Sequence, residues 1–156
     1  MLTLLLACPV VGMLLVLASP RTAVRAIRAI AVLATGAAFV VSLKLLFAFR
    51  AAEPGLQFVE RLPWIQPLNV FYFLGVDGIS LPMVLLTTLL GFLACLASFS
   101  IPERHKEYFA LYLLLEAGML GTFLALDLFL FYVFWEVVLV PMYFLIGIWG
   151  GGRREY

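Results

Sequence analysis

Two glutamates stand inside long apolar stretches of this sequence, and they are the residues most able to do chemistry. Glu116 interrupts the apolar run over residues 108–126, and Glu136 interrupts the run over residues 128–149. A carboxylate in the middle of a bilayer costs about 2.5–3.5 kcal/mol on insertion scales, and burial disfavours the charged form of the group. A glutamate in such a place is therefore poised to take up and release a proton.

The two carboxyl groups are expected at similar depths, because both can be counted from Asp127. Glu136 follows Asp127 by nine residues and Glu116 precedes it by eleven. At 1.5 Å per residue, these separations are about 13 Å and about 16 Å along a helix. Helix rotation is left open, so Glu116 faces Glu136, another helix or a water-filled path. We take Glu136 as the main candidate for proton transfer and Glu116 as a second, relay candidate; hydrogen bonding between helices is the alternative for both.

Other polar residues have simpler interpretations. Asp127 lies between two apolar runs, where it is expected to cap the following helix. Lys44 lies within about two turns of a helix end, so its long stem can reach the membrane surface. Pro141 removes a backbone donor within the last apolar run and weakens the helix there. His105 falls in the charged segment 103–107 and is expected to be a solvated loop residue.

No sequence pattern for binding a cofactor or a metal is present. Cys8 and Cys95 both lie in apolar runs, where small buried side chains are a better interpretation than metal ligands or a disulfide. There is no CxxC, no Gly-rich phosphate loop and no Ser-His-Asp set. The net charge of +1 gives no electrostatic reason to expect nucleic acid binding. We expect this chain to bind no cofactor or metal itself.

Composition and run lengths predict an all-α integral membrane protein. Of 156 residues, 65% are hydrophobic and 12% are charged, whereas soluble domains have about 45–50% apolar and about 25% charged residues. A helix needs about 20 mostly apolar residues to cross the hydrocarbon core. About five such transmembrane helices are predicted, at residues 2–19, 29–49, 79–101, 108–126 and 128–149.

The long connection over residues 50–76, between the second and third spans, is predicted to be a hairpin-like loop. Its prolines exclude a continuous helix, and residues 58–64 and 68–73 resemble two short extended pieces. Trp64 and Tyr72 suit the membrane–water interface. Anchoring at that interface is preferred over a ligand site.

The distribution of Lys and Arg predicts the orientation. Seven of them fall in the first loop, the third loop and the C-terminal tail, and two fall on the opposite side. The excess of positive charge on the cytoplasmic side places the N-terminus and the 50–76 loop outside and the tail in the cytoplasm. The seven are Arg21, Arg25, Arg28, Arg104, Lys106, Arg153 and Arg154, and the two are Arg50 and Arg61.

Two segments resemble the antiporter-like subunits of respiratory complex I. Residues 75–82, Gly-Val-Asp-Gly-Ile-Ser-Leu-Pro, resemble the start of the third span in that family. Residues 125–150, which contain Phe134-Trp135-Glu136 and the run Val-Pro-Met-Tyr-Phe-Leu-Ile over 140–146, resemble the fifth span. The pattern is closest to subunit M of bacterial NADH–quinone oxidoreductase, called chain 4 in its mitochondrial counterpart. Residues before 75 resemble the family in layout only.

The resemblance implies a division of the chain and roles for its acids. Residues 1–74 would be peripheral spans 1 and 2 with the external loop, and residues 75–156 would open the antiporter-like proton-translocating domain. Glu136 would be the proton-channel acid, and Glu103 or Glu107 would be the acid that many members place near the cytoplasmic end of the fourth span. The family fold has about fourteen spans in two inverted repeats, and the lysine that partners the proton-channel acid lies in a later broken helix. We therefore expect this chain to be an N-terminal fragment.

The expected function is that of a non-redox subunit of a proton-translocating NADH:quinone oxidoreductase, in a bacterial inner (plasma) membrane. NADH, FMN, iron–sulfur clusters and quinone are implied for the whole complex, and neighbouring antiporter-like membrane-arm subunits are the implied partners. One alternative is a subunit of a multi-subunit cation/proton antiporter or of a membrane-bound hydrogenase. The other is a structural five-span scaffold whose acids only hold helices together.

Overall fold

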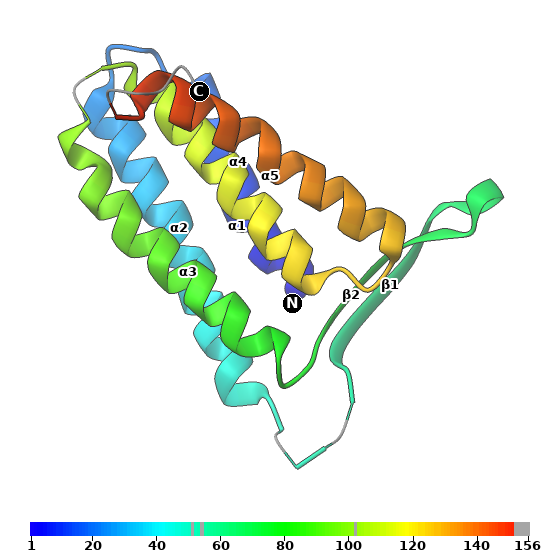
Figure 1. Ribbon diagram of the computed structural model, residues 1–156. Coiled ribbons are helices and arrows are strands. Elements are labelled where there is room, and N and C mark those ends of the chain that lie inside the picture. Colours follow the sequence, from blue (N-terminus) through cyan, green and yellow to red (C-terminus); the bar gives the residue numbers. More distant parts are fainter. Residues whose placement is uncertain (51, 54, 102, 152–156) are drawn as a thin grey trace.

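The computed structural model describes residues 1–50, 52–53, 55–101 and 103–151, so Arg153 and Arg154 of the predicted cytoplasmic tail lie outside the described residues. Helices dominate the described chain, and a two-stranded hairpin joins the second helix to the third (Figure 1). The elements are α1 (Leu2–Ala18), α2 (Val24–Ala48), β1 (Gln57–Ile65), β2 (Val70–Val76), α3 (Ser80–Ala97), α4 (His105–Leu124) and α5 (Leu128–Trp149). Short 3₁₀ turns lie at Gln66–Leu68 and Ser98–Ser100.

The predicted class of a helical membrane protein is confirmed. Four helices in the described chain, α2 to α5, are long and apolar enough to cross a membrane, with α3 counted through its 3₁₀ turn. Helix α1 is equally apolar in character but has 17 residues. Helix α2 begins at Val24 rather than at residue 29, because a helix need not stop where its apolar run does.

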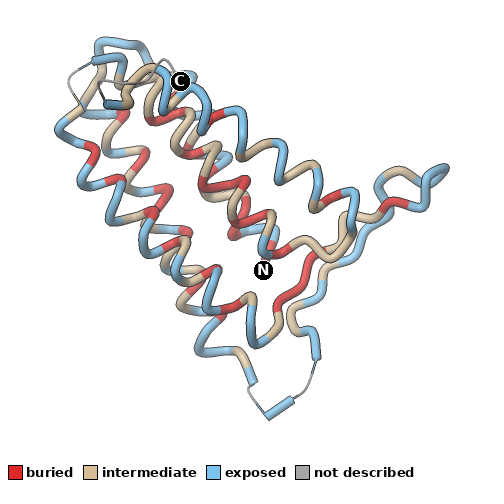
Figure 2. Tube along the Cα trace, viewed as in Figure 1, coloured by how far each residue is buried: buried red, intermediate tan, exposed pale blue. Residues whose placement is uncertain are grey.

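Helices α1 to α4 form a four-helix bundle, and α5 lies outside it against α4 (Figure 1). Around the bundle, each of α1, α2, α3 and α4 packs against the next, and α4 closes the ring on α1. Buried residues run along the inside of the bundle, whereas most of α5 is exposed or half-buried (Figure 2). On α5 the buried positions are Leu130 and Pro141.

Glycines let α4 approach its neighbour α5 closely. A Cβ at Gly121 would lie 2.2 Å from the ring of Phe134, and one at Gly118 would lie 2.9 Å from the side chain of Val138. Small residues at helix interfaces allow the backbones to come together, and this is the usual way in which helices associate in lipid. The contact fixes which face of α5 meets the bundle.

The turn between α4 and α5 is tied to the hairpin. The sequence predicted that Asp127 alone separates the last two spans, but α4 ends at Leu124. Ala125 pairs with Leu74 in a β-bridge, and the Leu126 N–H donates to the Phe73 carbonyl at 2.8 Å. The turn is longer than predicted because these two residues bond to β2 instead of continuing the helix.

Asp127 caps α5, as the sequence predicted. Its carboxylate accepts hydrogen bonds from the N–H groups of Phe129 at 2.9 Å and Leu130 at 3.2 Å. It also accepts from the Phe71 N–H on β2 at 3.2 Å. The donation from Phe71, followed by those from Leu130 and Phe129, holds the pKa of Asp127 below its usual value.

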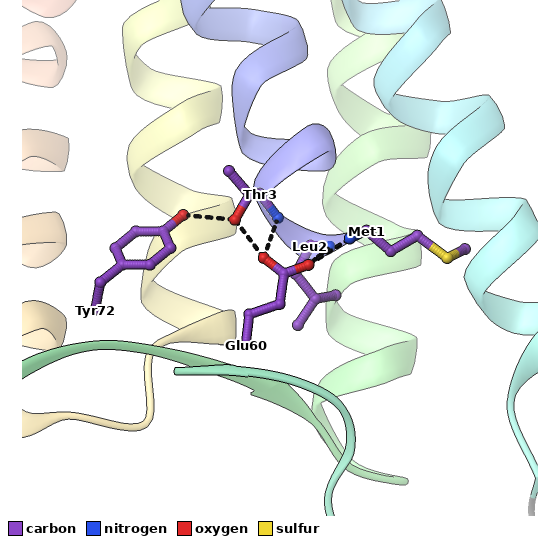
Figure 3. A network of polar contacts seen from close by, with 5 residues as sticks. All are labelled: Met1, Leu2, Thr3, Glu60 and Tyr72. Atoms are coloured by element: carbon purple, nitrogen blue, oxygen red, sulfur yellow. Dashed lines mark hydrogen bonds and ion pairs between the residues drawn. The ribbon is translucent and has the colours of Figure 1, made fainter. Parts of the chain in front are cut away.

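Glu60 on β1 joins the hairpin to the start of α1 (Figure 3). Its carboxylate pairs with the Met1 amino group, and it accepts from the Leu2 and Thr3 N–H groups at 2.9 Å and 3.1 Å. The Thr3 hydroxyl also binds it and lies 3.1 Å from the Tyr72 hydroxyl of β2. Partial burial opposes ionisation, but these donors outweigh it and lower the pKa of Glu60.

Replacing Gly121 with alanine should separate α4 from α5. The new Cβ would overlap the Phe134 ring, and overpacking of this kind costs about 1–3 kcal/mol. We expect Gly121→Ala to lower the unfolding temperature of the full-length protein. Gly147→Ala is the matched control, because both changes raise helix propensity equally and nothing described lies within 4 Å of a Cβ at Gly147. Equal unfolding temperatures for the two variants would contradict the assigned packing.

Replacing Asp127 with alanine should destabilise the protein in a pH-dependent way. Because the pKa of Asp127 is lowered in the folded state, the stability from its charge is present above the ordinary carboxyl pKa of about 4. That stability is lost as the pH falls through the lower folded value. The difference in unfolding temperature between wild type and Asp127→Ala should therefore be larger at neutral pH than well below pH 4. A difference that does not change with pH would show that the charge contributes nothing.

Candidate functional site

Glu136 lies on the outer face of α5. The opposite face of this helix meets α4 through Phe134 and Val138. Each of these is two residues from Glu136, which is about 200° around a helix of 3.6 residues per turn. Glu136 is accordingly exposed on the described part of the chain and points away from the bundle.

Aromatic side chains surround Glu136 on this outer face. Tyr132, one turn earlier, is 58% exposed and interacts with the Glu136 carboxylate. Trp135 and Tyr143 are 52% and 74% exposed. A carboxylate facing lipid directly is costly, and ionisable residues in spans nearly always face protein or a water-filled cavity. The physical expectation is that further protein covers this face.

Glu116 has the opposite environment, inside the bundle. Its side chain is 1% exposed, and its Oε1 lies 2.8 Å from where a Cβ on Gly91 of α3 would be. Among the residues that the structure describes, neither carboxylate oxygen has a hydrogen-bond partner. A buried carboxyl without partners is rare, because losing water without replacing its hydrogen bonds is expensive.

The structure does not bring Glu116 and Glu136 together. Helix α5 packs on α4 at Gly118 and Gly121, which lie about 200° and about 140° around the helix from Glu116. Glu116 therefore points to α3 while α5 lies on the other side of α4. With Glu136 turned outward on α5, the two acids face different surroundings.

Four helices supply the surroundings of Glu116. On α4, Tyr112 lies one turn away, and its hydroxyl donates to the Gly91 carbonyl of α3. Cys8 of α1 and Cys95 of α3 are near enough to interact electrostatically with Glu116. On α2, the buried Thr35 hydroxyl donates to its own helix, to the Ala31 carbonyl at 3.0 Å.

The carboxylates at the helix ends differ from Glu116 in having backbone donors. Asp77, before α3, accepts from the N–H groups of Ser80 at 2.6 Å and Ile79 at 3.0 Å. Those two bonds lower the pKa of Asp77. Asp127 and Glu60 have comparable donors. These three are structural anions, whereas Glu116 stands apart as a carboxyl that the fold leaves without donors.

The end of the bundle away from the hairpin carries basic residues. There the structure differs from the prediction for His105. This residue begins α4 rather than lying in a solvated loop, and its Nε2 is 3.2 Å from an Arg28 nitrogen of α2. Arg28 also donates to the Phe99 carbonyl at 2.8 Å. Of the two acids weighed for this end, Glu107 pairs with Arg21 at 3.0 Å, and the Glu103 carbonyl accepts from the Trp149 indole at 3.1 Å.

Sequence reasoning missed the polar residues that accompany Glu116. Tyr112 and Tyr108 precede it at four-residue spacing, a helical period that was the available signal. Gly91 could not be singled out, because its importance depends on which helix faces Glu116. In the described part of the chain, no group of three or more His, Cys, Asp or Glu side chains is placed to hold a metal ion, and Cys8 and Cys95 are unbridged.

Two family models match the chain. One, described as "NADH-ubiquinone oxidoreductase chain 4, amino terminus", matches residues 55–132. The other, "NADH:quinone oxidoreductase/Mrp antiporter, TM", matches residues 125–156 and includes Glu136. The first model alone covers half of the 156 residues.

Curated and solved relatives agree with these matches. NADH-quinone oxidoreductase subunit M of Rhodobacter capsulatus is 51% identical over 81% of this chain and 24% of its own length. NADH-ubiquinone oxidoreductase chain 4 of Arabidopsis thaliana is 41% identical over 97% of this chain and 31% of its own. A chain in a structure of respiratory complex I from Thermus thermophilus with bound NADH superposes with a TM-score of 0.80 and 33% identity, covering 99% of this chain and 30% of that one.

The chain thus spans about a quarter to a third of the length of the relatives it matches. Those relatives are named as subunits of an enzyme complex, NADH-quinone oxidoreductase. The match of the chain 4 family model, with the curated relatives and the shared fold, assigns this chain to the family of NADH-quinone oxidoreductase subunit M, also called chain 4.

Proposed function

We propose that this chain is part of a membrane-arm subunit that moves protons in a proton-translocating NADH:quinone oxidoreductase. The observation that carries the proposal is Glu136, an ionisable residue on the outward face of an otherwise apolar helix. Membership of the subunit M family supports it. The relatives are three to four times as long, and further protein of the subunit or of a partner is the natural cover for the outer face of α5.

The chemistry at Glu136 is the transfer of a proton to and from a carboxylate. When covered by protein, the group would take a proton from one side, becoming neutral, and release it to the other. The Tyr132 hydroxyl, one turn away, is placed to donate a hydrogen bond to the charged form. The subunit acts as a non-redox translocase: NADH, FMN, iron–sulfur clusters and quinone belong to other parts of the complex. Neighbouring antiporter-like subunits are its proposed partners.

The proposed topology has five spans. Helix α1, with 17 residues, reaches about 26 Å at 1.5 Å per residue, within the range for a span. The hairpin, Met1 and the α4–α5 turn share one end of the bundle, and we place this end outside the bacterial inner membrane. Residues 1–74 are proposed as the peripheral part and residues 75–156 as the opening of the translocating domain.

Replacing Glu136 with glutamine tests the proposal. Gln keeps the shape and cannot ionise, so redox-driven proton pumping by the assembled complex should fall to about a tenth or less, as expected for loss of a proton-transfer group. The measurement is the proton-to-electron ratio in membrane vesicles. Glu53→Gln is the control, because Glu53 is exposed in the loop before β1 and pairs with Arg50. An unchanged ratio with full assembly would refute the role.

Two other functions predict different results for the same variant. In a cation/proton antiporter subunit, which the second family model also covers, Glu136→Gln would stop cation exchange in vesicles that contain no NADH. In a structural scaffold, it would reduce assembly or thermal stability and leave proton movement per assembled complex unchanged. Measuring assembly, exchange and pumping on one preparation separates the three.

A further inference from the structure

A line of polar residues follows one face of α4 into the bundle. His105, Tyr108, Tyr112 and Glu116 are spaced by three, four and four residues, which puts them on one side of the helix. The line starts at the basic end, beside Arg28, and stops at Glu116. Helix α3 faces it with the buried Gly91 and Cys95, and the buried Ser98 follows in the adjoining 3₁₀ turn.

From Tyr108 inward, contacts with neighbouring residues hold the line in place. The Tyr108 and Ser98 hydroxyls are 2.8 Å apart. The Tyr108 and Tyr112 rings stack with centroids 6.2 Å apart and planes 17° from parallel. The Tyr112 hydroxyl binds the Gly91 carbonyl, the residue against which the Glu116 carboxyl packs. Gly91 therefore brings the last hydroxyl and the carboxyl to one place.

The bundle is closed on the hairpin side of Glu116. The Ser42 and Thr88 hydroxyls, buried and 2.7 Å apart, bond to each other and to their own helices. Beyond them, toward the hairpin, lies a buried apolar cluster with residues from α1 to α4 and from β2. Its buried members include Leu2, Leu5, Leu45, Leu74, Val76, Leu81, Val84, Leu120 and Leu124.

We propose that Glu116 is a second proton-binding site, loaded from the basic end of the bundle along Tyr108, Ser98 and Tyr112 and closed toward the hairpin end. This inference rests on the proposed function, since it adds a site to a proton-moving subunit. The proposed site at Glu116 is distinct from the one at Glu136, because the two side chains point to opposite sides of the α4–α5 pair.

The transfer needs only hydroxyl groups and water. Residues four apart on a helix are separated by about 6 Å along its axis, a gap that one water with two hydrogen bonds of about 2.8 Å spans. Each hydroxyl accepts a proton from the basic side and gives its own to the next group, so it is unchanged overall. The final proton forms an O–H bond on the Glu116 carboxylate and leaves by the reverse route.

No charged group opposes or pairs with Glu116 from its described neighbours. Facing it are Cys8 from α1, Cys95 from α3 and Tyr112 from α4, with the Thr35 hydroxyl of α2 hydrogen-bonded to Cys95. None of these carries a charge in its common form at neutral pH. The neutral acid is then the resting form of Glu116, since an unpaired anion there would lack both donors and water.

Infrared spectroscopy of the full-length protein in its complex tests the route. A protonated carboxylic acid has its own C=O stretching band, which Glu116→Gln assigns by removing it. The band should shift when the sample is placed in D₂O, and Tyr112→Phe should slow that exchange about tenfold or more, as for loss of a proton-transfer group. Thr88→Val, on the closed side, is the matched control and should leave the rate unchanged.

Two outcomes would overturn the inference. One is exchange as fast in Tyr112→Phe as in wild type, and the other is exchange slowed equally by Thr88→Val. Tyr108→Phe gives an independent check if Tyr112→Phe fails to assemble. The result is distinguishable from failure of the proposed function: if Glu136→Gln stops pumping while the Glu116 band neither exchanges along this route nor responds to turnover, Glu136 keeps its role and Glu116 loses its own.

Discussion

The close contact of α4 with its neighbours through glycine is the constraint on which the positions of both acids depend. Gly118 and Gly121 let α5 lie against one side of α4, and Phe134 and Val138 fill the contact. Because a helix turns by a fixed angle per residue, this contact points Glu116 into the bundle and Glu136 away from it. A bulkier residue at either glycine would change the rotation of α5 and with it the surroundings of its carboxylate.

The absence of water in a hydrocarbon core explains why the acids fall into two groups. At the membrane ends, Asp77 and Asp127 bond to free N–H groups at helix starts, and Glu60 bonds to the start of α1. These bonds also tie β2 to the α4–α5 turn and β1 to α1. Inside a bundle, backbone N–H groups bond to carbonyls of their own helix. Among the described residues, Glu116 finds no hydrogen-bond donor for either carboxylate oxygen.

The sequence predicted what depends on run length and composition, and missed what depends on helix rotation. The long apolar helices and the capping by Asp127 could be predicted from run length and residue spacing. The direction in which Glu116 points could not be predicted, because the role of Gly91 depends on α3 lying opposite Glu116. The α4–α5 turn was predicted too short and His105 was placed in a loop, because both depend on partners in β2 and α2 that are distant in sequence.

Two acids on opposite sides of a helix pair can still influence each other. Helix axes pack about 8–10 Å apart and each side chain reaches about 5–6 Å outward, so the carboxyls are separated by about 20 Å. At an effective dielectric constant of about 20, two charges at that distance interact by about 0.8 kcal/mol. This energy shifts a proton equilibrium about fourfold. At this distance no proton passes directly between the Glu116 and Glu136 carboxyls, but a charge on one would shift the proton affinity of the other.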